Sequence, residues 1–147
     1  MRIINDIIIH CTDNKPGCKM TMKDFTLEFQ RKYKTRYCGY HYVIFEDGRV
    51  EPGMPISRIG IHCKRHNTHS IGIAYVGGRS STGLPADTRT FDQKRAMLKL
   101  VTNLVKLYRC DVHGHRDYTD LKECPCFDAH MEYTNIYRRE VGLPLET

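Results

Sequence analysis

The sequence predicts a single α/β domain in which helices flank a central mixed β-sheet. Strand-like segments rich in isoleucine and valine alternate with segments of helical periodicity along the chain. No Pro-rich or Ser-rich linker and no internal repeat interrupts this alternation. Residues 1–147 are therefore expected to form one domain, a length that is enough to bury a core without disulfides.

The first half of the chain contains two expected strands and one helix. Residues 3–11 are dominated by isoleucine, which is typical of a central strand covered on both faces. Residues 21–34 carry apolar side chains at three- and four-residue spacing, which predicts an amphipathic helix. Residues 40–45 form the second strand, and the dipeptide Asp47-Gly48 places a tight hairpin turn after it.

The second half repeats the alternation of strand and helix. Residues 70–76 predict a strand, and Thr90 with Gln93 forms a capping box at the start of a long helix. A short strand over residues 111–115 and a final helix over residues 129–140 complete the domain.

The composition restricts the class of protein but does not identify its function. Net charge is +6, with Lys and Arg scattered along the chain, and this does not favour nucleic acid over an anionic cell-wall polymer. Seven cysteines without regular spacing indicate reduced thiols. No apolar run approaches the roughly 18 residues of a membrane span. We expect synthesis in the cytoplasm without a signal peptide, and neither a membrane nor a nucleic-acid partner.

Three distant residues have the composition of a catalytic zinc site: His10, His115 and Cys124. Each ends or follows an expected strand, and three protein ligands leave a fourth position for water. Strand alternation puts Cys11 on the face opposite His10. The same rule leaves His113 open as an additional ligand or supporting residue, and spacing leaves Cys126 open as well.

Six short motifs in a fixed order resemble the zinc-dependent N-acetylmuramoyl-L-alanine amidases of type 2. This family shares its fold with peptidoglycan recognition proteins and with the amidase-type lysozymes of tailed phages. The resemblance implies a peptidoglycan-recognition-protein-like amidase fold with one Zn2+ per chain at the end of a surface groove. The motifs are Ile8-Ile9-His10-Cys11-Thr12, Gly39-Tyr40-His41, His62 with Asn67 and Ser70-Ile71-Gly72, Gly77-Gly78, Gly114-His115-Arg116-Asp117 and Lys122-Glu123-Cys124-Pro125.

The resemblance also implies roles for individual side chains. It assigns the metal to His10, His115 and Cys124. Tyr40 and Lys122 match the catalytic side chains of the phage enzymes.

Substrate binding is implied for two further residues, His62 and Asn67. The chain departs from the family pattern at Glu123 and Cys126, and in a slightly longer loop before Cys124. The extra length affects where Lys122 lies relative to the substrate, because a group that must contact a reacting oxygen tolerates little displacement.

The expected function is hydrolysis of the amide bond between N-acetylmuramic acid and L-alanine in peptidoglycan. A phage or prophage endolysin, acting as a monomer after release to the cell wall, fits this best. Alternatives are a cytoplasmic amidase that recycles muropeptides, a non-catalytic peptidoglycan-binding protein, and a polymerase-inhibiting protein, since some phage relatives bind a polymerase. A non-catalytic receptor is expected to lack the cysteine ligand, which is present here as Cys124.

Overall fold

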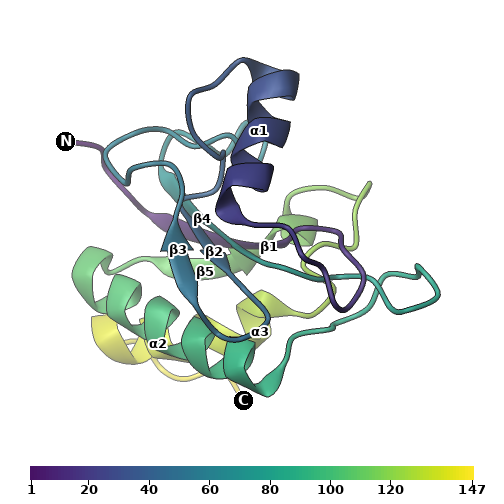
Figure 1. Ribbon diagram of the computed structural model, residues 1–147. Coiled ribbons are helices and arrows are strands. Elements are labelled where there is room, and N and C mark those ends of the chain that lie inside the picture. The colour runs from purple at the N-terminus through teal and green to yellow at the C-terminus, as the bar shows by residue number, and fades with distance from the viewer.

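A five-stranded mixed β-sheet forms the centre of the computed structural model, which describes residues 1–147 (Figure 1). The strands are β1 (Asp6–Cys11), β2 (Tyr42–Ile44), β3 (Val50–Pro52), β4 (Ser70–Tyr75) and β5 (Asp111–Gly114). Their order across the sheet is β3-β2-β4-β1-β5. All neighbours run parallel except β3, which is antiparallel to β2. The predicted fold class is confirmed.

Helices cover both faces of the sheet, with α1 on one side and α2 and α3 on the other (Figure 1). The helices are α1 (Met22–Tyr33), α2 (Phe91–Tyr108) and α3 (Ala129–Val141), together with the short 3-10 helix η1 (His115–Asp117). Capping boxes close the N-termini of α1 and α2, as the sequence predicts for α2. None of these helices combines the length and the apolar character needed to span a bilayer.

Side-chain alternation in β1 separates the core from the site. Ile7, Ile9 and Cys11 belong to the main hydrophobic cluster, which also contains residues of α2 and α3. Ile8 and His10 point to the opposite face, where His10 meets the ring of Tyr40. Because both faces are covered, even this histidine is only 1% exposed.

Several element boundaries differ from those expected, and β2 covers only Tyr42–Ile44 instead of residues 40–45. β1 begins at Asp6 and not at residue 3. The hairpin tip is wider than a two-residue turn, because the Phe45 amide donates to the Arg49 carbonyl at 2.8 Å and Gly48 adopts a φ of +88°. β5 ends at Gly114, since its amide donates to the Asp117 carboxylate at 2.8 Å and η1 begins there.

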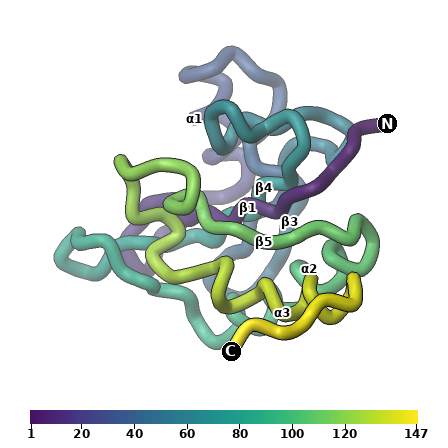
Figure 2. Tube along the Cα trace, turned by 180° about the vertical axis from the view of Figure 1, so that it is seen from behind, coloured from purple at the N-terminus to yellow at the C-terminus, as the bar shows by residue number.

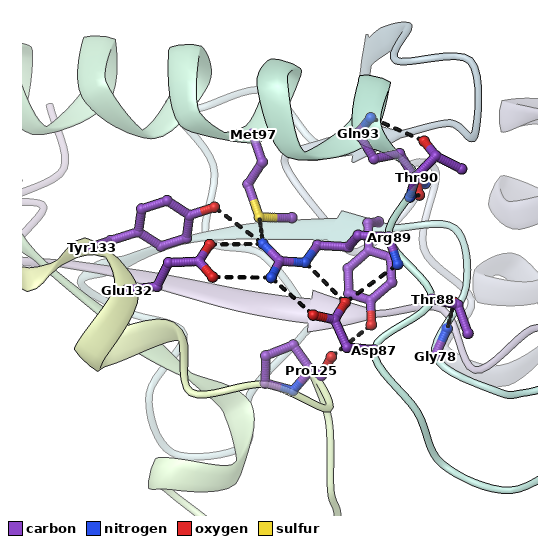
Figure 3. A network of polar contacts seen from close by, with 11 residues as sticks. Gly78, Asp87, Thr88, Arg89, Thr90, Gln93, Met97, Pro125, Glu132 and Tyr133 are labelled. Carbon is purple, nitrogen blue, oxygen red and sulfur yellow. Dashed lines mark hydrogen bonds and ion pairs between the residues drawn. The ribbon is translucent and has the colours of Figure 1, made fainter.

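A buried arginine joins the loop after β4 to α3 (Figure 3). The Arg89 guanidinium donates to both carboxylate oxygens of Glu132, at 2.8 and 3.0 Å, and to both oxygens of Asp87, each at 3.0 Å. Its side chain is only 2% exposed, so these ion pairs are screened far less than surface pairs. Two bidentate carboxylate contacts use the planar geometry of the guanidinium fully.

The same arginine helps to fix the segment that follows Cys124. Its guanidinium carbon lies 3.4 Å from the ring centroid of Phe127, a cation–π contact. The Tyr75 hydroxyl donates to the Pro125 carbonyl at 2.7 Å, which anchors the same segment to β4 (Figure 3). The loop that carries Cys124 is thus attached to the sheet immediately after that residue.

Candidate active site

Parallel pairing of β1 with β5 brings His10 and His115 together. Ile9 is paired with Gly114 in the register of the two strands. The residues that follow them, His10 and His115, therefore lie side by side at the carboxyl ends of the strands. The ring centroids of the two histidines are 4.7 Å apart.

Cys124 reaches the same place from the loop between β5 and α3, which Figure 2 shows from behind. The backbone amide of Cys11 donates to the Cys124 sulfur at 3.1 Å. One ligand atom from each of His10, His115 and Cys124 lies within 4.8 Å of the others. The structure therefore brings together the three side chains that the sequence predicts as metal ligands.

A chain of hydrogen bonds determines which nitrogen of His10 carries a proton. The Ser70 hydroxyl donates to the His66 carbonyl at 2.6 Å, because a carbonyl only accepts. The Ser70 oxygen, 3.2 Å from Nε2 of His62, then accepts from that nitrogen. Nδ1 of His62 is left with its lone pair and accepts from Nε2 of His10 across 2.9 Å. Nδ1 of His10 is consequently unprotonated.

Burial keeps the histidines of the site neutral. Burial, with the charges of His62, His115 and Lys122, holds the pKa of His10 well below its usual range. Burial lowers the pKa of His62 to about 3. Burial and the charge of Lys122 also lower the pKa of His115. At neutral pH each ring therefore offers a lone pair to a metal instead of a proton.

These observations agree with the donor set of a catalytic zinc ion. Two neutral imidazole nitrogens and one cysteine sulfur are ligands that Zn2+ prefers, and three of them leave one coordination position open. A metal-binding histidine usually donates its other ring N–H to a carboxylate, a backbone carbonyl or water, and here Nδ1 of His62 takes that place as the acceptor for Nε2 of His10. The residues present fit the metal.

Tyr40 and Lys122 lie around this cluster in different surroundings. The Tyr40 ring packs between His10 and Phe29 of α1, with ring centroids 5.3 and 5.4 Å away. Burial, followed by the nearby Cys124, raises its pKa well above the usual value, so the phenol remains a proton donor. Lys122 is exposed on the loop before Cys124 and pairs with no carboxylate.

The structure gives His62 and Asn67 supporting contacts. Both ring nitrogens of His62 bond to protein atoms, namely those of His10 and Ser70. The Asn67 side-chain oxygen accepts from the amides of His62 and Cys63 at 3.0 and 2.9 Å, which fixes the turn that carries His62. Direct substrate binding by these two residues stays a prediction.

The two residues left open as additional ligands belong to other clusters. Nδ1 of His113 is 2.8 Å from a carboxylate oxygen of Asp6. The Cys126 thiol donates to the Gly78 carbonyl across 3.4 Å, and burial raises its pKa to about 12.

Sequence reasoning missed the parts of the site that support His10. The sequence marks Ser70 as the start of a strand and as part of a family motif, but not as the residue that sets the tautomer of His62. Gly72 makes the arrangement possible, because a Cβ at this position would lie 2.5 Å from the His62 ring. The position of Gly72 within a predicted strand could have indicated this, since a glycine in a strand often marks the close approach of another group.

The fold and the site together have the features of a hydrolase whose possible metal ligands lie at the carboxyl ends of parallel strands. Comparison with known proteins agrees. Residues 1–127 match the family model described as N-acetylmuramoyl-L-alanine amidase. This chain belongs to that family, and it is a peptidoglycan amidase.

Individual relatives cover most of the chain. The endolysin of Enterobacteria phage T3 is 31% identical over 123 residues, which are 83% of this chain and 80% of the relative. The solved structure of the amidase LysC from Clostridium intestinale URNW superposes with a TM-score of 0.72 at 24% identity, covering 97% of this chain and 88% of that one. Drosophila PGRP-LB, a peptidoglycan-recognition protein, superposes at 0.71 with 24% identity, covering 90% and 80%. These structures share the fold.

Proposed function

We propose that this chain is a zinc-dependent endolysin that cleaves the amide bond between N-acetylmuramic acid and L-alanine in the bacterial cell wall. The observation that carries the proposal is the convergence of His10, His115 and Cys124, with Nδ1 of His10 kept free of a proton. The amidase family is generally zinc-dependent. One Zn2+ per chain would be held by these three side chains, and because one chain supplies the whole set, a monomer suffices.

The bound metal supplies Lewis acidity, which polarises an amide carbonyl and makes water a nucleophile near neutral pH. The protein's own groups complete the chemistry. Tyr40, protonated and packed against His10, donates a hydrogen bond to the oxygen that gains negative charge. Lys122 brings a positive charge from the exposed loop, which stabilises the same oxygen or protonates the departing amine.

The supporting shell has its own part in this proposal. His62 holds the His10 ring in one orientation, and Asn67 holds the turn that carries His62. A zinc ligand fixed in this way binds without first losing rotational freedom or a proton. His62 and Asn67 remain our candidates for the side of the groove that meets the stem peptide.

Similarity to phage endolysins favours action on the intact wall over recycling of muropeptides in the cytoplasm. Cys124 distinguishes the chain from a receptor that only binds peptidoglycan, because a thiol ligand beside two neutral histidines completes a hydrolytic metal site. The polymerase partner stays a prediction.

Mass spectrometry of digested peptidoglycan tests the proposal. Purified sacculi incubated with the wild-type protein should release free stem peptides that begin with L-alanine and leave intact glycan strands. A chelator should abolish the release and added zinc should restore it. Cleavage within the glycan or within the stem peptide, or release that is indifferent to chelator, would refute the assignment.

A further inference from the structure

We propose that a second divalent transition-metal site lies on the edge of the sheet, formed by Asp111, His113 and His130. One ligand atom from each of these residues lies within 4.8 Å of the others. The cluster shares no residue with His10, His115 and Cys124, so it does not depend on the amidase assignment.

Two elements build this cluster. Asp111 and His113 are two apart in β5 and therefore project from the same face of the strand. His130 comes from the first turn of α3, which packs on β5. The rings of His113 and His130 lie face to face, with centroids 4.6 Å apart and planes only 3° from parallel. All three residues are half-buried, which leaves room for water to complete a coordination shell.

Hydrogen bonds already orient both imidazoles. Nδ1 of His113 is 2.8 Å from the Asp6 carboxylate, and the Tyr118 hydroxyl donates to the other oxygen of that carboxylate. Nδ1 of His130 donates to the Val112 carbonyl at 2.8 Å. These are the two partners, carboxylate and backbone carbonyl, that most often orient metal-binding histidines. Each ring keeps its Nε2 atom for another ligand.

The donor set selects the class of metal. Two imidazole nitrogens with one carboxylate suit Zn2+, Ni2+ or Cu2+, whereas Mg2+ and Ca2+ prefer oxygen ligands alone. Because the two rings are nearly parallel and an imidazole lone pair lies in the plane of its ring, one ring must turn out of the stack before both Nε2 atoms can point to one ion beside Asp111. An ion bound there would join β5 to α3, the strand and helix on either side of the catalytic loop.

Metal counting separates the two sites. After dialysis against micromolar Zn2+, the wild-type protein should retain about two zinc ions per chain and His130→Ala about one. His69→Ala is the matched control, because its Nδ1 also bonds to a backbone carbonyl, that of Ile3, but no second ligand lies beside it. It should retain two.

Combining variants distinguishes a failure of the second-site proposal from a failure of the proposed amidase centre. Cys124→Ser should retain only the ion at the second site, and Cys124→Ser with His130→Ala should retain none. A wild-type protein that holds one zinc, lost in Cys124→Ser and kept in His130→Ala, would overturn the second site and leave the amidase centre intact. Two zinc ions in Cys124→Ser would overturn the amidase centre instead.

A measurement on the unaltered chain guards against variants that fail to fold. Paramagnetic Ni2+ added to protein that carries a single equivalent of zinc, which leaves the second site free, should broaden the amide resonances of residues 111–113 and 129–131 first. It should also raise the melting temperature, because an ion that binds only the folded state stabilises it. Broadening elsewhere, or none at equimolar Ni2+, would overturn the proposal.

Discussion

Nε2 of His10 lies 2.9 Å from Nδ1 of His62, and this contact determines the tautomer of a proposed metal ligand. The proton assignment passes from Ser70 at the start of β4, through His62 in the segment before that strand, to His10 in β1. A hydrogen bond within the protein thus prepares the Nδ1 lone pair before any metal arrives.

The first prediction concerns this relay. His62→Ala should weaken zinc binding by about 10- to 100-fold, since supporting partners of metal ligands typically contribute that much. Ser70→Ala should weaken it less, because His62 remains but can take either tautomer. Competition with a zinc-binding dye measures both affinities. Unchanged affinity in both variants would contradict the relay, and His69→Ala serves as the control for loss of a neighbouring imidazole.

The second prediction separates two nearby cysteines. Cys124→Ser should lose the catalytic zinc and the release of stem peptides. Cys126→Ser should keep both, because its sulfur bonds to the Gly78 carbonyl and lies outside the ligand set. Metal analysis and sacculus digestion on the same preparations provide the measurements. The opposite pattern would assign the thiol ligand to Cys126.

The third prediction addresses the proposed catalytic side chains. Tyr40→Phe and Lys122→Ala should each lower kcat by about 100- to 1,000-fold, the usual effect of removing one group that stabilises an oxyanion. Both variants should still bind one catalytic zinc. Steady-state rates on a soluble muropeptide, measured with the zinc content, test this. A lysine variant with full activity would show that the longer loop has moved the residue out of reach.

The fourth prediction concerns stability. Arg89→Met should destabilise the fold by about 3 kcal/mol, because it leaves two carboxylates beside a buried site without their partner. The figure is near the low end of the range for buried pairs, since Glu132 is 42% exposed and water screens it. Urea unfolding of the two proteins at pH 7 measures the difference.

The same arginine predicts a pH dependence. Burial alone would raise the pKa of Asp87 and Glu132, but the hydrogen bonds of Arg89 outweigh it and hold both pKa values below normal. Their stabilisation is complete above the unfolded pKa values, about 4, and is lost as pH falls through the lower folded values. The wild-type advantage over Arg89→Met should therefore shrink below pH 4. A constant difference down to pH 2 would contradict this account.

Local patterns predicted the elements of this fold and much less of its supporting contacts. The isoleucine run of β1 and the capping box of α2 are signals contained within a few residues: α2 begins at the predicted cap, and β1 ends at the predicted residue but starts three residues later than expected. The predicted end of β5 was one residue too late. The Asp117 carboxylate accepts from the Gly114 amide at the start of η1, and the hydrophobic periodicity of the sequence does not show this contact.

The candidate ligands were found from residue type and family motifs, but their geometry required the sheet. Only the pairing of Ile9 with Gly114 shows that His10 and His115 meet. Arg89 lies in the polar segment just before α2, where an arginine is normally solvated, and its burial against Glu132 depends on the docking of α3. Contacts between residues this far apart are decided by tertiary packing, which a single sequence does not display.

The register between β1 and β5 also limits where insertions and deletions can be tolerated in this chain. A slip of one residue along this edge would place Arg116 where His115 stands and turn the imidazole toward α3. Insertions or deletions at Arg109 and Cys110, just ahead of β5, should consequently abolish metal capture. Changes of length between Tyr118 and Lys122 should leave the three proposed ligands in place and act on the position of Lys122, because the chain beyond Cys124 is tied down separately by Tyr75 and Arg89.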